Sequence, residues 1–350
     1  MKQLILEILP KADGCAFAPF AVYVPTSAPD GAHYVKYNFT FKHSDVRDVY
    51  TPNSNSNVSL YRIREAHLVR VCEVSDTGVA QELLCEVLQK GELSLAIRED
   101  LPSTAHLAPT AKPIERGGAR YSADFIGGIH GDERLVDVAL SADGRAMDLT
   151  AAGPRTAYCN ALCFCQSATL YRWGTSREGY DGDPVAEHTQ RITVDANGLQ
   201  NRQGVRWLCS DFHTRENATF LQMFTMKREW QGAPVCERFE TFDADGKPLG
   251  SAALTLPVTE ECHQCLPSPA TRSVRYGSAT SGISAEVSFS ILGDSLRADK
   301  TWIHVRVPQA DNKFYASFSS PKHGRVPQCG ELWELMLHAH IDYDPAGGHV

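Results

Sequence analysis

One stretch decides the fold class, and it reads Val138-Ala139-Leu140-Ser141-Ala142-Asp143-Gly144-Arg145-Ala146-Met147. Apolar and polar residues alternate on both sides of Asp143-Gly144, a pair that adopts positive φ easily and is typical of tight hairpin turns. Residues 192–199, 239–247 and 73–79 repeat the pattern of two alternating runs around a turn. Together these stretches predict β-hairpins along much of the chain.

Further strands are predicted outside the hairpins, at residues 35–41, 58–73, 93–98, 168–173, 219–228, 284–292, 301–307, 313–319 and 332–343. Residues 80–90 fit either one short helix or another strand. Many strands at short spacing, joined by turn residues, are typical of a sandwich or barrel. We therefore predict an all-β fold, a large antiparallel, jelly-roll-like β-sandwich. It is expected to form a single domain over residues 1–350, with loop or subdomain breaks near 101–113 and 260–271.

The charge and hydropathy of the sequence exclude some classes of binding partner. The 350 residues include 34 Lys+Arg and 42 Asp+Glu, which gives a net charge of -8. This balance argues against a general nucleic-acid binder, because such proteins need an excess of cations against the phosphates. No apolar run approaches the roughly 18 residues that span a bilayer, so no membrane partner is expected. The sequence does not indicate an oligomeric state.

The cysteines bear on the compartment. There are 11 of them, scattered along the chain, and the N-terminal residues lack the long apolar core of a signal peptide. We therefore expect reduced thiols and a cytoplasmic protein, although a secreted chain without its leader would have the same features. Cys262 and Cys265 have zinc-knuckle spacing and are the candidates for a zinc site, to which Cys159, Cys163 and Cys165 could add ligands.

The segment 124–134 is the most distinctive candidate site. Gly127, Gly128 and Gly131 surround His130 with small residues, so a bulky ligand could approach the imidazole. Two acids and a cation follow at once, namely Asp132, Glu133 and Arg134. The structural alternative is that the glycines form bulges in a curved sheet and the charges solvate a loop.

Two families share features of this segment. His130 and Glu133 resemble the His-x-x-Glu zinc pair of the carboxypeptidase and succinylglutamate-desuccinylase type, although a hairpin at 135–149 follows where that fold has a helix. Ile129-His130-Gly131 resembles the Gln-Ile-His strand motif of jelly-roll alginate lyases, with Gly128 in place of the glutamine. The first resemblance implies a zinc hydrolase. The second implies a jelly-roll polysaccharide lyase.

The stretch 332–343 forms a second candidate site. Side chains alternate across a strand, so one face of this stretch is apolar core. The other face carries Glu334, His338, His340 and Asp342. On a concave sheet these residues would line a cleft for a sugar, and two imidazoles spaced His-x-His could also bind a metal. The alternative is an ordinary solvent-facing strand.

A third candidate lies around residues 171–194. If the strand there alternates, His188 faces the same side as apolar residues, where a hydrogen-bonded interior role competes with catalysis. Arg191 follows on the same strand. The preceding loop begins with Tyr171 and Trp173, and such aromatic loops can stack on sugars or hold a loop to its own domain.

These residues suit a β-elimination on a uronic-acid polysaccharide. That reaction needs a group that neutralises the uronate carboxylate, a base for the C5 proton and an acid for the leaving oxygen. His130 is the candidate base, because an imidazole titrates near neutral pH. Arg134 or Arg191 could neutralise the carboxylate, and Tyr171 or Tyr315 could serve as the acid. A glycoside hydrolase would instead use paired carboxylates such as Asp132, Glu133 or Glu334.

We therefore expect a carbohydrate-active enzyme, foremost a lyase, which acts on an oligo- or polysaccharide without a cofactor. The predicted catalytic residues are His130, Arg134, Tyr171, His188 and Arg191. The predicted substrate-binding residues are Asp132, Glu133, Trp173, Glu334, His338 and His340. Two alternatives stay open: a non-catalytic carbohydrate-binding or phage-tail-like receptor-binding sandwich, and a zinc hydrolase that uses His130 and Glu133. Convergence of His130, His188, His338 and His340 in one cleft would favour an enzyme.

Overall fold

The computed structural model describes residues 3–44, 58–88, 95–99, 114–116, 119–121, 125–126, 132–151, 153–171, 184–216, 218–254, 258–307 and 309–346. Within these ranges every regular element is a strand. The predicted all-β sandwich is therefore confirmed, and most of the ambiguous stretch 80–90 belongs to the strand β5 (Gly78–Leu88). The described part of the chain contains no helix that could cross a membrane.

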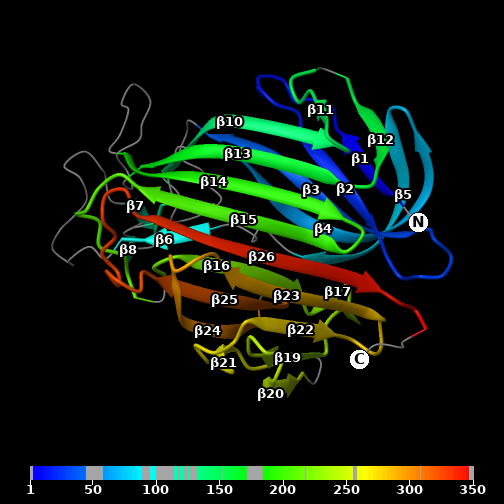
Figure 1. Cartoon of the computed structure of the whole chain (residues 1–350). Coiled ribbons are helices and arrows are strands. Elements are labelled where there is room, and N and C mark those ends of the chain that lie inside the picture. Colours follow the sequence, from blue (N-terminus) through cyan, green and yellow to red (C-terminus); the bar gives the residue numbers. More distant parts are fainter. Residues whose placement is uncertain are drawn as a thin grey trace.

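The strands form two layers, which Figure 1 shows one behind the other. Neighbouring strands of the front layer are antiparallel. Their order is β11 (Arg145–Met147), β10 (Asp132–Ala142), β13 (Leu162–Tyr171), β14 (Pro184–Asp195), β15 (Gly198–Trp207), β26 (Leu332–Tyr343), β23 (Ile283–Ile291), β22 (Ser273–Gly277), β19 (Arg238–Phe242) and β20 (Pro248–Ala253).

The back layer contains the remaining long strands. Its order is β12 (Arg155–Cys159), β1 (Leu4–Ile8), β2 (Phe20–Pro25), β3 (His33–Ser44), β4 (Val58–Ser75), β5, β16 (Leu221–Lys227), β25 (Asp311–Ser319), β24 (Arg297–Arg306) and β21 (Cys262–Cys265). β6 (Leu95–Arg98) pairs with β16 and with β9 (Phe125–Ile126). Two short antiparallel two-stranded ribbons lie outside these layers: β7 (Ile114–Arg116) with β8 (Ala119–Tyr121), and β17 (Glu229–Trp230) with β18 (Ala233–Pro234). The layers join where β10 runs parallel to the start of β4.

All four predicted hairpins are present, as β10–β11, β14–β15, β19–β20 and β4–β5. In the first of them the turn residues Asp143 and Gly144 have φ of 47° and 76°. Such a turn matches the right-handed twist of the strands that it joins. Turn chemistry therefore determines where these strands reverse, as the sequence predicts.

The core fills the space between the layers. Inward side chains of the front layer, such as Phe289 and Trp333, are buried together with Phe314 and Phe318 of the back layer. The rings of Phe289 and Phe314 lie 6.1 Å apart, centre to centre, so the two layers are in direct contact there. Burial of apolar side chains on one face leaves the other face of the front layer free for polar residues.

Candidate functional site

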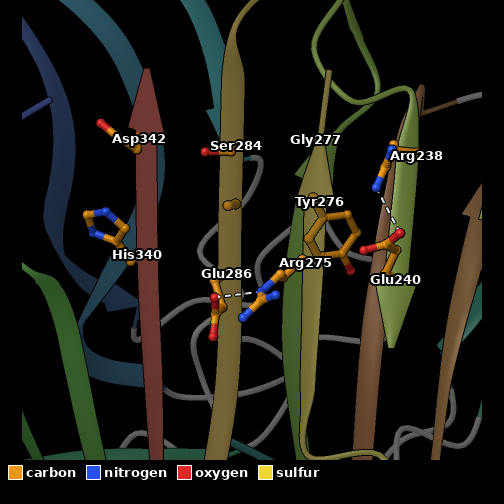
Figure 2. A pocket seen from close by; sticks show the side chains of 10 residues that line it. Arg238, Glu240, Arg275, Tyr276, Gly277, Ser284, Glu286, His340 and Asp342 are labelled. Carbon is orange, nitrogen blue, oxygen red and sulfur yellow. Dashed lines mark hydrogen bonds and ion pairs between the residues drawn. The ribbon is translucent and has the colours of Figure 1, made fainter. Parts of the chain in front are cut away.

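A hollow of about 500 Å³ lies on the outer face of the front layer, over β26, β23, β22 and β19. Its volume is within the range of small-molecule sites. Figure 2 shows its charged side chains projecting from neighbouring strands. These side chains are His340 and Asp342 from β26, Glu286 from β23, Arg275 from β22, and Arg238 and Glu240 from β19.

Strand alternation puts these residues on the outside. Along β26, Trp333, Leu335, Leu337, Ala339 and Ile341 are buried, and the residues between them are partly exposed. The predicted division of residues 332–343 into an apolar face and a face with Glu334, His338, His340 and Asp342 is confirmed. Only His340 and Asp342 of that polar face line the hollow.

Register then joins the four strands into one row. His340 lies opposite Glu286, Glu286 opposite Arg275, and Arg275 opposite Glu240. We call these four residues the outer row. Because side chains of directly opposed residues on one sheet face are neighbours, the outer row forms a band of alternating charge and imidazole across the hollow.

Ion pairs order the outer row. Arg275 Nε donates to Glu286 Oε2 at 2.9 Å, and Arg238 Nη2 donates to Glu240 Oε1 at 2.8 Å. The Arg275 guanidinium also lies over the ring of Phe242, 4.6 Å from the ring centre. This contact restricts the orientation of the guanidinium. The side chains of Arg275 and Glu286 remain 58% and 44% exposed, so both can reach a ligand in the hollow.

His340 lies at the other end of the row. Its Nδ1 is buried and makes no hydrogen bond in the described part of the chain. The β14–β15 turn closes against it, because a Cβ on Gly198 (φ +112°) would lie 2.5 Å from the Ala339 carbonyl oxygen and 3.0 Å from the His340 Cα. Only glycine fits this turn, which therefore packs directly against the backbone of β26 at Ala339 and His340.

Asp342 supplies a second carboxylate beside His340. Burial alone would raise the pKa of Asp342, but hydrogen bonds from Ser27 and from the backbone of Tyr343, with the charge of His340, lower it overall. The Ser27 N–H donates to Asp342 Oδ1 at 2.7 Å. Asp342 is therefore an anion at neutral pH, held to the turn after β2.

The hollow thus combines hydrogen-bond acceptors, donors and one imidazole on a rigid sheet. Carboxylates of Glu286, Glu240 and Asp342 accept hydrogen bonds from hydroxyl groups, and Arg275 and Arg238 donate to them. His340 and Glu286 are directly opposed on adjacent strands, so an imidazole and a carboxylate lie at the same level of the hollow. Chemically, the site can bind a polyhydroxylated molecule and transfer protons to and from it.

A second polar cluster lies inside the sandwich. The side chains of Gln166, Gln190 and Gln203 are directly opposed across β13, β14 and β15, and we call them the inner row. His188 bonds through Nδ1 to Glu133 Oε1 at 2.5 Å and through Nε2 to Gln203 Oε1 at 3.2 Å. His188 and Glu133 are 4% and 1% exposed, so this cluster belongs to the interior.

The predicted catalytic residues therefore lie on different faces. On β14, His188 faces the interior, whereas Arg191 is exposed on the outside. Arg134 stacks over the Tyr171 ring, 5.6 Å from its centre. His130 lies outside the described residues. Among the described histidines, His188 is separated from His338 and His340 by the sheet, so the expected single cleft of histidines is not formed by these three.

The predicted substrate-binding residues are dispersed in the same way. Glu133 faces His188 inside, and Glu334 pairs with Arg202 Nη2 at 2.8 Å on the outer face. His338 lies opposite Gln200 and Ser288, one repeat along β26 from the hollow. Asp132 begins β10, and Trp173 lies outside the described residues. Their predicted roles stay predictions.

The cysteines of the described residues are not all free thiols. Cys262 and Cys265 form a disulfide, so the prediction of reduced thiols is wrong for this pair, and their sulfurs are not free thiolates for zinc. The local chain brings them together because β21 bulges between them. Cys163 and Cys165 contact each other on β13, with their sulfurs 3.7 Å apart, and the described cysteines other than 262 and 265 are free.

Sequence reasoning missed most of the outer row. Glu286 falls within the predicted strand 284–292 and Glu240 within the predicted hairpin 239–247, but neither was predicted as a site residue, and Arg275 lies outside the predicted strands. Alternation along each strand could have placed Glu286 on a polar face. The pairing of β26 with β23, which brings it to His340, depends on contacts far apart in the chain.

No family model matches the chain, and no curated protein matches it. Solved structures overlap it at low similarity. A putative aldose 1-epimerase from Escherichia coli K12 is 9% identical, with 92% of this chain and 99% of that chain covered and a TM-score of 0.39. A galactose 1-epimerase from Lactobacillus acidophilus NCFM is 10% identical, with 98% and 100% covered and a TM-score of 0.39. A galactose mutarotase-like protein from Clostridium acetobutylicum is 10% identical, with 81% and 95% covered and a TM-score of 0.36.

The expected resemblance to jelly-roll alginate lyases is wrong, since the overlapping structures are named as epimerases and a mutarotase-like protein. The β-elimination reaction that it implied loses its support as well. The motif that suggested it, Ile129-His130-Gly131, lies outside the described residues.

Proposed function

We propose that this chain is a carbohydrate-active protein that binds a small sugar in the hollow and interconverts its anomers. The observation that carries the proposal is the direct opposition of His340 and Glu286 at the wall of the hollow. An imidazole and a carboxylate on adjacent strands can act at two atoms of one sugar ring. The activity is of the aldose-epimerase class, which replaces the lyase expected from the sequence.

The chemistry needs two proton transfers. The Glu286 carboxylate removes the proton of the anomeric hydroxyl while protonated His340 gives a proton to the ring oxygen, and the bond between that oxygen and the anomeric carbon breaks. The open-chain aldehyde rotates about the adjacent carbon–carbon bond. Closure reverses both transfers, so the protein is unchanged and no cofactor is consumed.

The rest of the hollow suits a sugar. Arg275, Arg238 and Glu240 present donors and acceptors at the spacing of neighbouring strands, and hydroxyl groups on successive carbons can use both kinds. Arg275 also bonds to Glu286, which fixes the direction of the carboxylate. We assign these residues to binding and orientation rather than to proton transfer.

The rate of mutarotation tests the proposal. Freshly dissolved α-D-glucose and α-D-galactose are followed by polarimetry with and without protein. We expect the protein to accelerate equilibration, and Glu286→Gln and His340→Ala each to reduce the acceleration at least about 100-fold, the usual contribution of an acid or base. His213→Ala, which removes an exposed histidine outside the hollow, should match the parent protein. Full activity in both hollow variants would refute the assignment.

A non-catalytic sugar-binding module is the second candidate. It is favoured by the ion pair between Glu286 and Arg275, because a carboxylate whose direction is fixed by a guanidinium is a good acceptor for sugar hydroxyl groups. Saturation-transfer NMR with the same sugars separates the two. Binding that Arg275→Ala abolishes, without any acceleration of mutarotation, would support the module and exclude the enzyme.

A further inference from the structure

A cluster outside the hollow has the composition of a metal site. It lies at the edge of the back layer, where β21 pairs with β24. Cys262 lies opposite Val305 and Cys265 opposite Ile303. The two residues between the cysteines, His263 and Gln264, therefore lie opposite a single residue, His304. This is a β-bulge, a feature that re-aims side chains at the edge of a sheet.

The Cys262–Cys265 disulfide spans the bulge. Both cysteines are partly buried and pack against the main core, whereas His263 between them is exposed. The sulfurs therefore hold the two ends of the bulge against the sheet and leave His263 on its outer side. The two ends of this bulge at the sheet edge are thus joined by a covalent bond.

Three possible ligands meet beside this bulge. His304 Nε2 lies 2.8 Å from Glu261 Oε1, and the rings of His263 and His304 lie 4.8 Å apart, centre to centre. One donor atom from each of Glu261, His263 and His304 can be chosen so that all lie within 4.8 Å of one another. Ligands of a tetrahedral zinc ion are about 3.3 Å apart, so small side-chain rotations complete the site.

The nearby cations are engaged with other groups. Lys300 Nζ donates to Gln264 Oε1 at 2.7 Å, and Arg306 pairs with Asp311. Lys313, which lies opposite His304 in the register, has its Nζ 5.1 Å from the Tyr315 ring centre. Glu261 contributes a carboxylate to the cluster, and an anionic ligand attracts a divalent cation.

We propose that Glu261, His263 and His304 bind a borderline divalent metal ion of the zinc class, and that the Cys262–Cys265 disulfide organises the site. Two imidazoles and a carboxylate are the donor set that such ions prefer. Three protein ligands leave an open coordination position for water or for a ligand. The site is separate from the hollow and does not depend on its function.

Calorimetric titration of the tag-free protein with Zn²⁺, and visible absorption with Co²⁺ as a spectroscopic probe, test the proposal. We expect one ion per chain and a tetrahedral Co²⁺ spectrum. His263→Ala and His304→Ala should each lower the affinity at least tenfold, whereas His213→Ala should not. Circular dichroism checks that every variant folds. Binding of equal strength in all three variants, or no stoichiometric binding by the parent, would overturn the site.

The role of the disulfide has its own test. The Cys262→Ser/Cys265→Ser double variant keeps all three ligands but frees the bulge, so its Zn²⁺ affinity should fall at least about threefold. Cys15→Ser/Cys329→Ser is the matched control, since both of these cysteines are free. Equal affinity in the two double variants would refute an organising role for the disulfide. Mutarotation is unaffected in either case, because the hollow lies in the other layer.

Discussion

Two polar rows cross the front layer, and they differ in what surrounds them. The outer row, from His340 to Glu240, spans four strands on the open face, and the side chains of its two central residues are 58% and 44% exposed. The inner row, from Gln166 to Gln203, spans three strands on the face that meets the back layer and is buried. Both arise in the same way, from residues in direct register on adjacent strands.

The difference lies in the partners. Inner-row amides bond to one another, to Gln222 of the back layer and to the backbone of Tyr61. A buried polar group without a partner is costly, so such a network serves stability. The exposed groups of the outer row, those of Arg275 and Glu286, can exchange water for a ligand. A polar row on a sheet is therefore a candidate site only when the opposite layer does not cover it.

The largest effect is expected inside the sandwich. Glu133→Ala leaves His188 buried without its acidic partner, and removal of one member of a buried pair costs about 3–5 kcal/mol. The free energy of unfolding, measured in urea, should fall by this amount. Glu187→Ala, which removes an exposed carboxylate of the same sheet, should change it by less than about 1 kcal/mol. Similar losses in both variants would remove the distinction between the buried and the exposed face of the front layer.

Gln166→Leu tests the link between the inner row and the back layer. It leaves both the N–H and the C=O of Tyr61 without the side chain that bonds them now. We expect a loss of about 2–4 kcal/mol in unfolding free energy, because two buried groups lose a partner. Gln200→Leu, on the exposed face of β15, is the control. A neutral Gln166→Leu would mean that the row carries little stability.

Gly198→Ala tests the turn that packs against β26 at His340. The new Cβ meets the Ala339 carbonyl at 2.5 Å, and φ of +112° is unfavourable for alanine. The unfolding free energy should fall by about 1–3 kcal/mol, as for strained backbone positions. Gly144→Ala also has positive φ but no atom within 4 Å of the new Cβ, so its loss should be smaller. Equal losses would show that the contact with β26 is unimportant.

The outer row should show the opposite behaviour. Arg275→Ala and Glu286→Ala remove members of an exposed ion pair, so each should change stability by less than about 1 kcal/mol. Sugar binding, measured by NMR titration, should nevertheless be lost. A destabilisation as large as that of Glu133→Ala would assign the outer row to structure instead.

The smallest effect concerns pH. The pKa of Asp342 is lowered below its ordinary value of 3.8 in the folded protein, so its contribution is complete above that value. The contribution is lost as pH falls through the lowered pKa. Asp342→Asn should therefore be less stable than the parent in thermal unfolding at about pH 6, and the difference should shrink steadily as the pH is lowered below 3.8. A difference that persists at low pH would exclude the carboxylate as its cause.

Local sequence signals account for much of the fold. Strand β26 has the predicted bounds, and its outward face with His340 follows from alternation. The partners of that face could not be predicted, because β15 and β23 flank β26 through pairings between distant segments. Glu286 and Arg275 reach His340 only through this register. The disulfide was missed for a related reason, since the bulge in β21 forms against β24.

The contact of Gln166 with Tyr61 has a mechanical consequence. Apolar side chains between two sheets attract without direction, so small sliding motions of one sheet over the other change their energy little. The Gln166 amide instead engages the N–H and the C=O of one residue in the facing sheet, at 3.0 and 2.9 Å. A shift along β4 breaks both bonds at once. This side chain therefore fixes the position of one sheet along the strand direction of the other.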